Sequence, residues 1–189
     1  MKDIIDISDW QEGINFDDIV KRDIHGVIIK ISEGTAETAN FETFLEECVS
    51  HKLPWGVYVF THAKSPEMAQ AEAEACITYL GGRVPNLGIW FDVEDKDVLS
   101  IGDVTDICSA FICRLNEHGL YAGIYAGYYT LRDNIRTDDL ADYVHYWMPQ
   151  YDSDSCDFAE VCNGHLAGWQ YTESEQIGDF TVDMNEWYD

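Results

Sequence analysis

Eight short segments rich in β-branched and aromatic residues recur along the chain at fairly even intervals, and this repetition limits the possible folds more than any other feature. Helical patterns separate the early segments. Strands that alternate with helices pair in parallel, and eight of them in one domain favour a closed barrel of the α/β class. The predicted strands are residues 3–8, 26–32, 55–62, 87–94, 121–126, 143–151, 166–172 and 180–187.

Three segments between these strands have the apolar spacing of amphipathic helices. Residues 40–53 place a row of apolar side chains on one face, and residues 103–118 do the same before stopping at Gly119. The segment 65–82 begins with Ser65 as an N-cap followed by proline, and it ends in two glycines. The last three strands leave little room for helices between them. The sequence therefore predicts an irregular TIM-like (β/α) barrel with about eight strands and fewer helices than a full (β/α)₈.

The length of 189 residues suits one domain, and no linker, low-complexity tract or internal repeat divides the chain. We therefore expect a single domain over residues 1–189. Apolar residues make up 46% of the chain and aromatic residues 13%, which excludes a disordered protein.

The chain carries a formal net charge of −25, from 36 acidic and 11 basic residues. This charge repels phosphate backbones and anionic membrane surfaces, so nucleic acid is not an expected partner. No apolar run approaches the roughly 18–20 residues of a membrane span, and the first residues lack the apolar core of a signal peptide. We expect a soluble protein that is made in the cytoplasm and does not insert into membranes.

The six cysteines and six histidines form no CxxC, HExxH or other zinc-binding spacing. No metal or cofactor is therefore predicted, and buried thiols are the expected state of the cysteines. Cys156 and Cys162 lie six residues apart in a polar segment, so a disulfide between them is an open alternative if the protein reaches an oxidising compartment.

Acidic residues gather at the ends of several predicted strands. Asp6, Glu33, Asp92 and Glu94 stand at carboxyl ends of strands, and Asp183 lies within the last strand. In an α/β barrel the carboxyl end carries the working residues, because the loops that follow the strands meet there. Several carboxyl groups from distant parts of the chain are therefore expected at one mouth. The alternative is that a chain with 36 acids clusters some of them by chance.

The spacing within the fourth predicted strand favours catalysis by a pair of carboxyl groups. Residues two apart on a strand share a face and are separated by about 6.6 Å, so Trp90, Asp92 and Glu94 are expected to point into the barrel. Two carboxyls at this distance suit glycoside hydrolysis, in which one protonates the leaving oxygen. The distance does not decide between retention and inversion. Asp95 has the opposite parity and is assigned to the following loop as a solvated charge.

Aromatic and amide side chains near the same strand ends are candidates for sugar binding, because a sugar cleft combines apolar faces with hydrogen-bonding groups. Lys30 is the one base in an otherwise apolar strand, and pairing with a mouth carboxylate is favoured over extension into solvent. The candidate substrate-binding residues are Lys30, Glu33, Tyr58, Tyr125, Trp147, Gln150 and Gln170.

Taken in order, the strand segments resemble those of glycoside hydrolase family 25, the N-acetylmuramidase lysozymes of bacteria and their phages. The resemblance covers essentially the whole chain, and the ordered set of motifs is more specific than any single one. The segments that carry it are DISDWQEGINFDDI, GVIIKISEGT, GVYVFTHAKSPEMAQAEA, IWFDVED, YAGIYAGYY, YWMPQY, LAGWQYTE and FTVDMNEW.

This resemblance implies a single catalytic domain that cleaves the β-1,4 bond between N-acetylmuramic acid and N-acetylglucosamine in peptidoglycan. Glu94 would be the general acid, and Asp92 would either orient the substrate acetamido group or assist water. Asp6 and Asp183 would complete the carboxylate set. A monomer is expected, with a separate wall-binding module as a possible addition. The protein would act on the cell wall after release during phage lysis or after export.

Two other classes of function remain open at this point. A chitinase-like hydrolase or an N-acetylglucosaminidase also uses a DxE motif on a barrel strand, although chitinases carry further acids upstream that this chain lacks. A non-catalytic module that binds cell-wall glycans, or an acid cluster that binds Ca²⁺, belongs to a different class. The complete carboxylate set argues against a lectin, and no EF-hand-like loop supports calcium binding.

Overall fold

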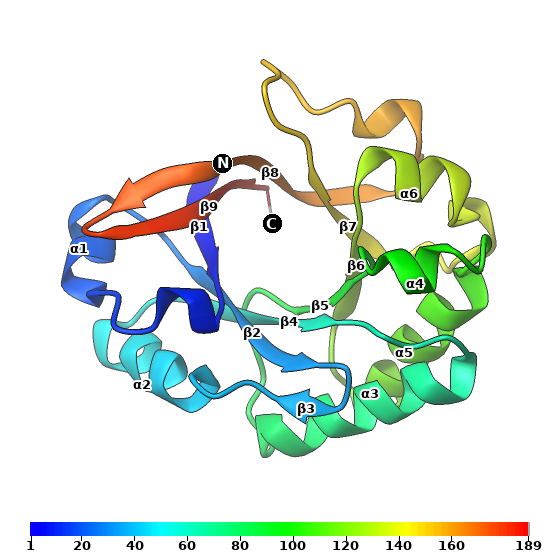
Figure 1. Ribbon diagram of the computed structural model, residues 1–189, viewed down its shortest axis with the longest axis horizontal. Coiled ribbons are helices and arrows are strands. Elements are labelled where there is room, and N and C mark those ends of the chain that lie inside the picture. The colour runs from blue at the N-terminus through cyan, green and yellow to red at the C-terminus, as the bar shows by residue number, and fades with distance from the viewer. Residues whose placement is uncertain (189) are drawn as a thin grey trace.

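The computed structural model describes residues 1–188, and their strands form one sheet that closes on itself (Figure 1). Pairing of β1 with β2 closes a ring of eight strands, while β3 pairs only with β2 and lies outside the ring. The predicted barrel is therefore confirmed. The strands are β1 (Lys2–Ile7), β2 (Val27–Glu33), β3 (Ala36–Glu37), β4 (Trp55–Phe60), β5 (Ile89–Asp92), β6 (Ala122–Tyr125), β7 (His145–Pro149), β8 (His165–Ile177) and β9 (Phe180–Trp187).

Most of the ring is parallel, as strands that alternate with helices require. From β1 through β8 each neighbouring pair in the ring runs parallel. β9 is antiparallel to both of its neighbours, β8 and β1, because it follows β8 through a tight turn at Gly178. β8 is also longer than predicted, since hairpin pairing with β9 carries it on to Ile177.

The three predicted helices are present as α2 (Phe41–His51), α3 (Pro66–Leu80) and α5 (Thr105–Glu117). Figure 1 shows α2, α3 and α5 outside the ring, with the β8–β9 hairpin on the side away from α3. The structure adds short elements that the sequence did not predict. They are α1 (Phe16–Lys21), α4 (Lys96–Leu99), α6 (Tyr128–Asp133) and the 3₁₀ turns η1 (Asp9–Gln11), η2 (Thr137–Asp139) and η3 (Phe158–Glu160).

Local signals set the bounds of the longest helix, α3. Ser65 Oγ accepts a hydrogen bond from the backbone N–H of Met68, and Pro66 occupies the first turn, where its missing N–H costs nothing. Gly81 ends the helix with φ +57°, a left-handed conformation that glycine adopts without strain.

Three tryptophans fill the interior of the barrel below its mouth. Trp90, Trp147 and Trp187 contact one another edge to face, with ring centroids 5.3 to 6.1 Å apart. Glycines make room for these rings: a Cβ on Gly123 would lie 2.4 Å from Trp90, and one on Gly168 would lie 2.3 Å from Trp187. The interior of the barrel is therefore filled with packed side chains, and a substrate can bind only at its open end.

Candidate active site

The carboxyl end of the barrel holds a cavity of about 80 Å³ that opens beside a groove of about 420 Å³. The four predicted catalytic carboxyl groups line both spaces, and they come from β1, from the end of β5 and from β9. Of the predicted substrate-binding residues, Tyr58, Tyr125, Trp147 and Gln170 line the small cavity, while Lys30 lines the groove. The sequence thus located most of this mouth.

Asp6 and Asp183 stand opposite each other in the antiparallel register of β1 and β9. Asp6 is buried, and its Oδ2 accepts hydrogen bonds from Gln170 Nε2 at 2.9 Å and from Asn185 Nδ2 at 2.8 Å. Burial and the charge of Asp183 raise the pKa of Asp6 well above its usual range, against these two donors. Burial and the charge of Glu173 raise the pKa of Asp183 to about 6.

Asp92 is the last residue of β5 and is buried at the bottom of the cavity. No group of residues 1–188 donates a hydrogen bond to its Oδ1, which is also buried. Burial, followed by the charge of Glu94, raises the pKa of Asp92 well above its usual range, and the nearby Lys30 ammonium opposes this rise. A buried carboxyl oxygen without a donor is an acceptor that substrate can satisfy.

Glu94 follows two residues after Asp92, beyond the end of β5, and is exposed at the mouth. Desolvation by the surrounding walls raises the pKa of its carboxyl, and the charges of Asp183 and Glu173 raise it further. The predicted alternation is confirmed, because Asp92 and Glu94 line the same cavity and Trp90 lies in the barrel interior beneath them. Glu94 is the most exposed of the four carboxyl groups, and its pKa is also raised.

A shell of hydrogen bonds fixes the amides that hold Asp6. Gln170 Oε1 accepts from the hydroxyls of Tyr125 at 2.9 Å and Tyr151 at 2.5 Å, so its NH₂ group points to Asp6. Asn185 Oδ1 likewise accepts from Trp147 Nε1 at 2.7 Å. Asn185 was not predicted, although it has the same strand parity as Asp183 and the sequence therefore carried the signal.

Lys30 pairs with a carboxylate, and its partner is Glu33: Lys30 Nζ lies 2.8 Å from Glu33 Oε2 and 4.9 Å from the centroid of the Phe60 ring. Glu33 lies beside the groove rather than in it. Gln150 lines neither the cavity nor the groove, because β7 ends at Pro149 and the chain turns away. Its amide instead bonds to the backbone N–H and carboxyl of Asp157.

Trp10 is a groove residue that sequence reasoning missed. Its side chain is 89% exposed, yet it stands on the wall of the groove. The turn η1 that carries it is held by a capping box between Ser8 and Gln11, and Gln11 Nε2 donates to the Thr181 carbonyl at 2.9 Å. An exposed indole on a braced turn provides a flat apolar surface at the mouth.

The expectation for Asp95 is corrected, and the disulfide that was left open for Cys156 and Cys162 is not formed. Asp95 is not a solvated loop charge: it caps α4, accepting from the Asp97 backbone N–H at 2.7 Å, and it bonds to His62 Nδ1. Cys156 and Cys162 are free thiols, and Cys162 Sγ instead accepts from the Gly164 backbone N–H at 3.1 Å.

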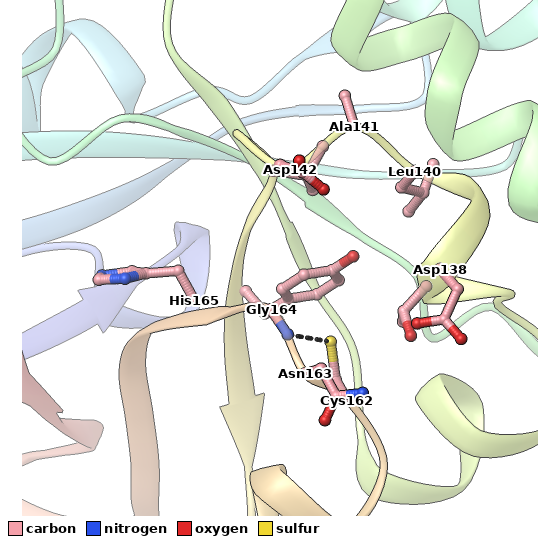
Figure 2. Close-up of a pocket in the computed structure, with 11 residues that line it drawn as sticks. Asp138, Leu140, Ala141, Asp142, Cys162, Asn163, Gly164 and His165 are labelled. Carbon is pink, nitrogen blue, oxygen red and sulfur yellow. Dashed lines mark hydrogen bonds between the residues drawn. The ribbon is translucent and has the colours of Figure 1, made fainter.

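Cys162 belongs to a different part of the molecule from the carboxyl groups. Figure 2 shows it in a cavity of about 480 Å³ together with Gly164 and His165, at the amino ends of β7 and β8. Within residues 1–188, no group of histidine, cysteine and acidic side chains has a geometry that holds a metal ion. None of the helices in this range is long and apolar enough to cross a membrane.

The fold is shared with several solved structures of low sequence identity. The CTP1L endolysin is 22% identical with a TM-score of 0.88, and the match covers 100% of this chain and 67% of the endolysin. The autolysin LytC of Streptococcus pneumoniae, in complex with a synthetic peptidoglycan ligand, is 22% identical with a TM-score of 0.82, covering 99% of this chain and 46% of LytC. The catalytic domain of endolysin ply40 from the Listeria monocytogenes bacteriophage P40 is 23% identical with a TM-score of 0.80, covering 100% and 93%.

Sequence comparison gives the family. No curated protein matches the chain significantly. The profile of the family described as "Glycosyl hydrolases family 25", however, matches residues 5–180. This range includes three of the four mouth carboxyl groups, and Asp183 lies just beyond it. The barrel, its acidic mouth and this match over most of the chain lead to one conclusion: the chain belongs to glycosyl hydrolases family 25.

Proposed function

We propose that this glycoside hydrolase is a muramidase, which cleaves the β-1,4 bond between N-acetylmuramic acid and N-acetylglucosamine in peptidoglycan. The observation that carries the proposal is the convergence of four carboxyl groups with distinct environments in one cavity of a family 25 barrel. LytC, which shares the fold, was solved with a peptidoglycan ligand, and this supports the choice of substrate.

In this proposal Glu94 is the general acid. Its raised pKa favours the protonated form that a general acid needs, and its exposed position gives it access to a glycosidic oxygen in the groove. Asp92 accepts the N–H of the substrate acetamido group through its unpaired Oδ1, which turns the acetamido oxygen toward the anomeric carbon. Asp183, which lies opposite Asp6, stabilises the oxocarbenium-like transition state when its carboxyl is ionised.

We further propose a role for the surrounding groups in binding the glycan. Tyr58, Tyr125, Trp147 and Gln170 form the walls of the small cavity, and the Lys30–Glu33 pair borders the groove. The barrel acts as a single catalytic domain and a monomer on the cell wall. Because a net charge of −25 opposes binding to an anionic wall, a separate wall-binding module would raise its effective concentration there.

Incubation with purified peptidoglycan tests the bond specificity directly. Borohydride reduction of the products followed by mass spectrometry identifies the sugar at each new reducing end. Reduced muramic acid is the expected result. Reduced glucosamine would instead identify a glucosaminidase, and binding without new reducing ends would identify a glycan-binding module.

The rate of hydrolysis is expected to fall as pH rises through the pKa of Glu94. A general acid must hold its proton before the bond breaks, and burial and neighbouring charges hold the pKa of Glu94 above that of an ordinary glutamate. The optimum therefore lies on the acidic side of neutrality. Initial rates on soluble peptidoglycan fragments across pH give the profile, and a rate that stays constant up to pH about 9 would contradict this assignment.

Replacing Trp10 by alanine is expected to raise KM about tenfold with little change in kcat. Covering about 50 Å² of the indole by a sugar ring would contribute roughly 1.3 kcal/mol, which is close to a factor of ten in affinity. Since the side chain is 89% exposed, the melting temperature should not change. Trp10→Phe should recover part of the affinity, while Tyr129→Phe, which alters an exposed aromatic residue on α6, serves as control. An unchanged KM in Trp10→Ala would exclude the contact.

A further inference from the structure

We infer that His62 is a positioning residue for hydrolysis, which in its protonated form ties the loop of Glu94 to the end of β2. This inference rests on the proposed function. His62 follows β4, and its two ring nitrogens face two different carboxyl groups. Nδ1 bonds to Asp95 Oδ2, and Nε2 lies 3.2 Å from Glu33 Oε1. Only the imidazolium form donates a hydrogen bond from both nitrogens at once.

The hydrogen bond between His62 and Asp95 connects the imidazole to the segment of the general acid. Asp95 is the residue directly after Glu94, and its carboxyl is shared between His62 and the backbone N–H of Asp97 at the start of α4. Its carbonyl also accepts from the backbone N–H of Leu99 at 2.9 Å. Holding Asp95 from both sides fixes the backbone from which the Glu94 side chain extends.

The hydrogen bond between His62 and Glu33 connects the imidazole, through Lys30, to Asp92. Glu33 bonds to His62 through Oε1 and to Lys30 Nζ through Oε2, at 2.8 Å. The ammonium of Lys30, which is 15% exposed, lies above the Phe60 ring and opposes the rise in the pKa of Asp92. The hydrogen bond from His62 therefore holds the Glu33 carboxylate in place, and Glu33 in turn holds the Lys30 ammonium. The position of this ammonium influences the charge on Asp92.

The backbone of His62 is itself fixed by a buried acid. Glu72 on α3 is 3% exposed, and its carboxyl accepts from the His62 backbone N–H at 3.0 Å and from Thr61 Oγ1 at 2.6 Å. The carboxyl groups around His62 are thus Glu33 from β2, Asp95 from the start of α4 and Glu72 from α3. The Phe60 ring also faces the imidazole, with 5.4 Å between the two ring centroids. The carboxyl groups of Asp95 and Glu33, which bond to the ring nitrogens, favour the charged imidazole.

The sign of the pH dependence follows from these contacts. The hydrogen bond to Asp95, together with that to Glu33, raises the pKa of His62 above its usual value. The link is complete below the pKa of an unfolded histidine, about 6.5, and is lost as pH rises through the raised pKa in the folded protein. Above that pH one carboxyl group loses its donor, and the Glu94 loop is free to move.

His62→Gln tests the inference, because glutamine donates to one carboxyl group but not to both at any pH. We expect wild-type kcat to exceed that of the variant by about tenfold near pH 5.5, and the ratio to approach one above pH about 9. A ratio that does not change with pH would overturn the inference. Circular dichroism and the melting temperature establish that the variant is folded.

His51→Gln is the matched control. His51 on α2 also lies between two carboxyl groups, Asp17 and Glu47, but it is outside the mouth. The hydrogen bond to the Glu47 backbone carbonyl raises the pKa of His51, and the two carboxyl groups raise it further. Its replacement should change stability in the same pH range and leave the ratio of kcat values constant. If both variants shifted that ratio equally, a general effect of removing a histidine would account for the result.

A readout without substrate separates this inference from the proposed function. If wild-type protein released no reducing ends, the muramidase proposal would fail, and His62 would still be tested by NMR. In Glu33→Gln the pKa of the His62 imidazole should fall, and in His62→Gln the Asp97 and Leu99 amides should exchange with solvent faster. An unchanged imidazole titration together with unchanged exchange would overturn the link itself.

Discussion

Glu94→Gln is expected to lower kcat for peptidoglycan hydrolysis by about 10²–10⁴-fold while the barrel stays folded, because the variant removes the transferable proton and keeps the shape of the side chain. Glu94 is exposed at the mouth, and its side chain takes part in none of the hydrogen bonds described within residues 1–188, so stability should change little. Release of reducing ends from purified peptidoglycan, measured with a matched circular dichroism spectrum, gives the comparison.

Asp97→Asn provides the control for Glu94→Gln. Asp97 is exposed three residues further along the chain and pairs only with Lys64 at 3.2 Å among the described contacts, so its replacement removes one negative charge from the same segment. Its activity should remain at the wild-type level. If Glu94→Gln kept more than a few per cent of wild-type activity, another residue would have to be the general acid.

Asp92→Asn is expected to have two opposite effects, a loss of activity and a gain in stability. Activity should fall by about 10- to 100-fold, which is less than for Glu94→Gln, because an orienting group is lost rather than the proton donor. Stability at neutral pH should rise, because burial and the charge of Glu94 raise the pKa of Asp92 and make its ionised form costly. Each kcal/mol gained corresponds to about 2–4 °C in melting temperature.

The pH dependence of this stability gain distinguishes burial of charge from other causes. A carboxyl with a raised pKa destabilises the fold only above the pKa of the unfolded chain, about 3.9, and the penalty grows as pH rises toward the folded value. The difference in melting temperature between Asp92→Asn and wild type should therefore be largest at neutral pH and shrink toward pH about 4. A constant difference would show that packing, and not ionisation, is responsible.

Local patterns were sufficient to predict the ring and most of its mouth. Alternating strands and helices imply a parallel barrel, and strand parity places Asp92 and Glu94 on the inner side, where the structure has them. The length of β8 escaped prediction, because residues 173–176 are polar and become a strand only through pairing with β9.

The missed residues depend on contacts between distant segments. Asn185 belongs to the mouth because its amide reaches Asp6, and His62 belongs to the inferred link because Glu33 and Asp95 converge on it from two other strand ends. Gln150 was wrongly placed in the cleft because its alternating aromatic segment carries no signal in the sequence that β7 ends at Pro149. Side-chain direction after a strand is set by the loop, which periodicity does not describe.

The register that sets Asp6 opposite Asp183 also fixes when this site can exist during folding. β1 precedes and β9 follows every other strand of the barrel along the chain, so their pairing closes a loop that contains the rest of the barrel. Such a closure carries a large entropic cost and comes late, after the more local β–α–β units have formed. A nascent or partly folded chain, in which β1 already pairs with β2, would thus carry Asp6, Asp92 and Glu94 on an unclosed sheet without Asp183. The hydrolase would become active only at the final step of its own assembly.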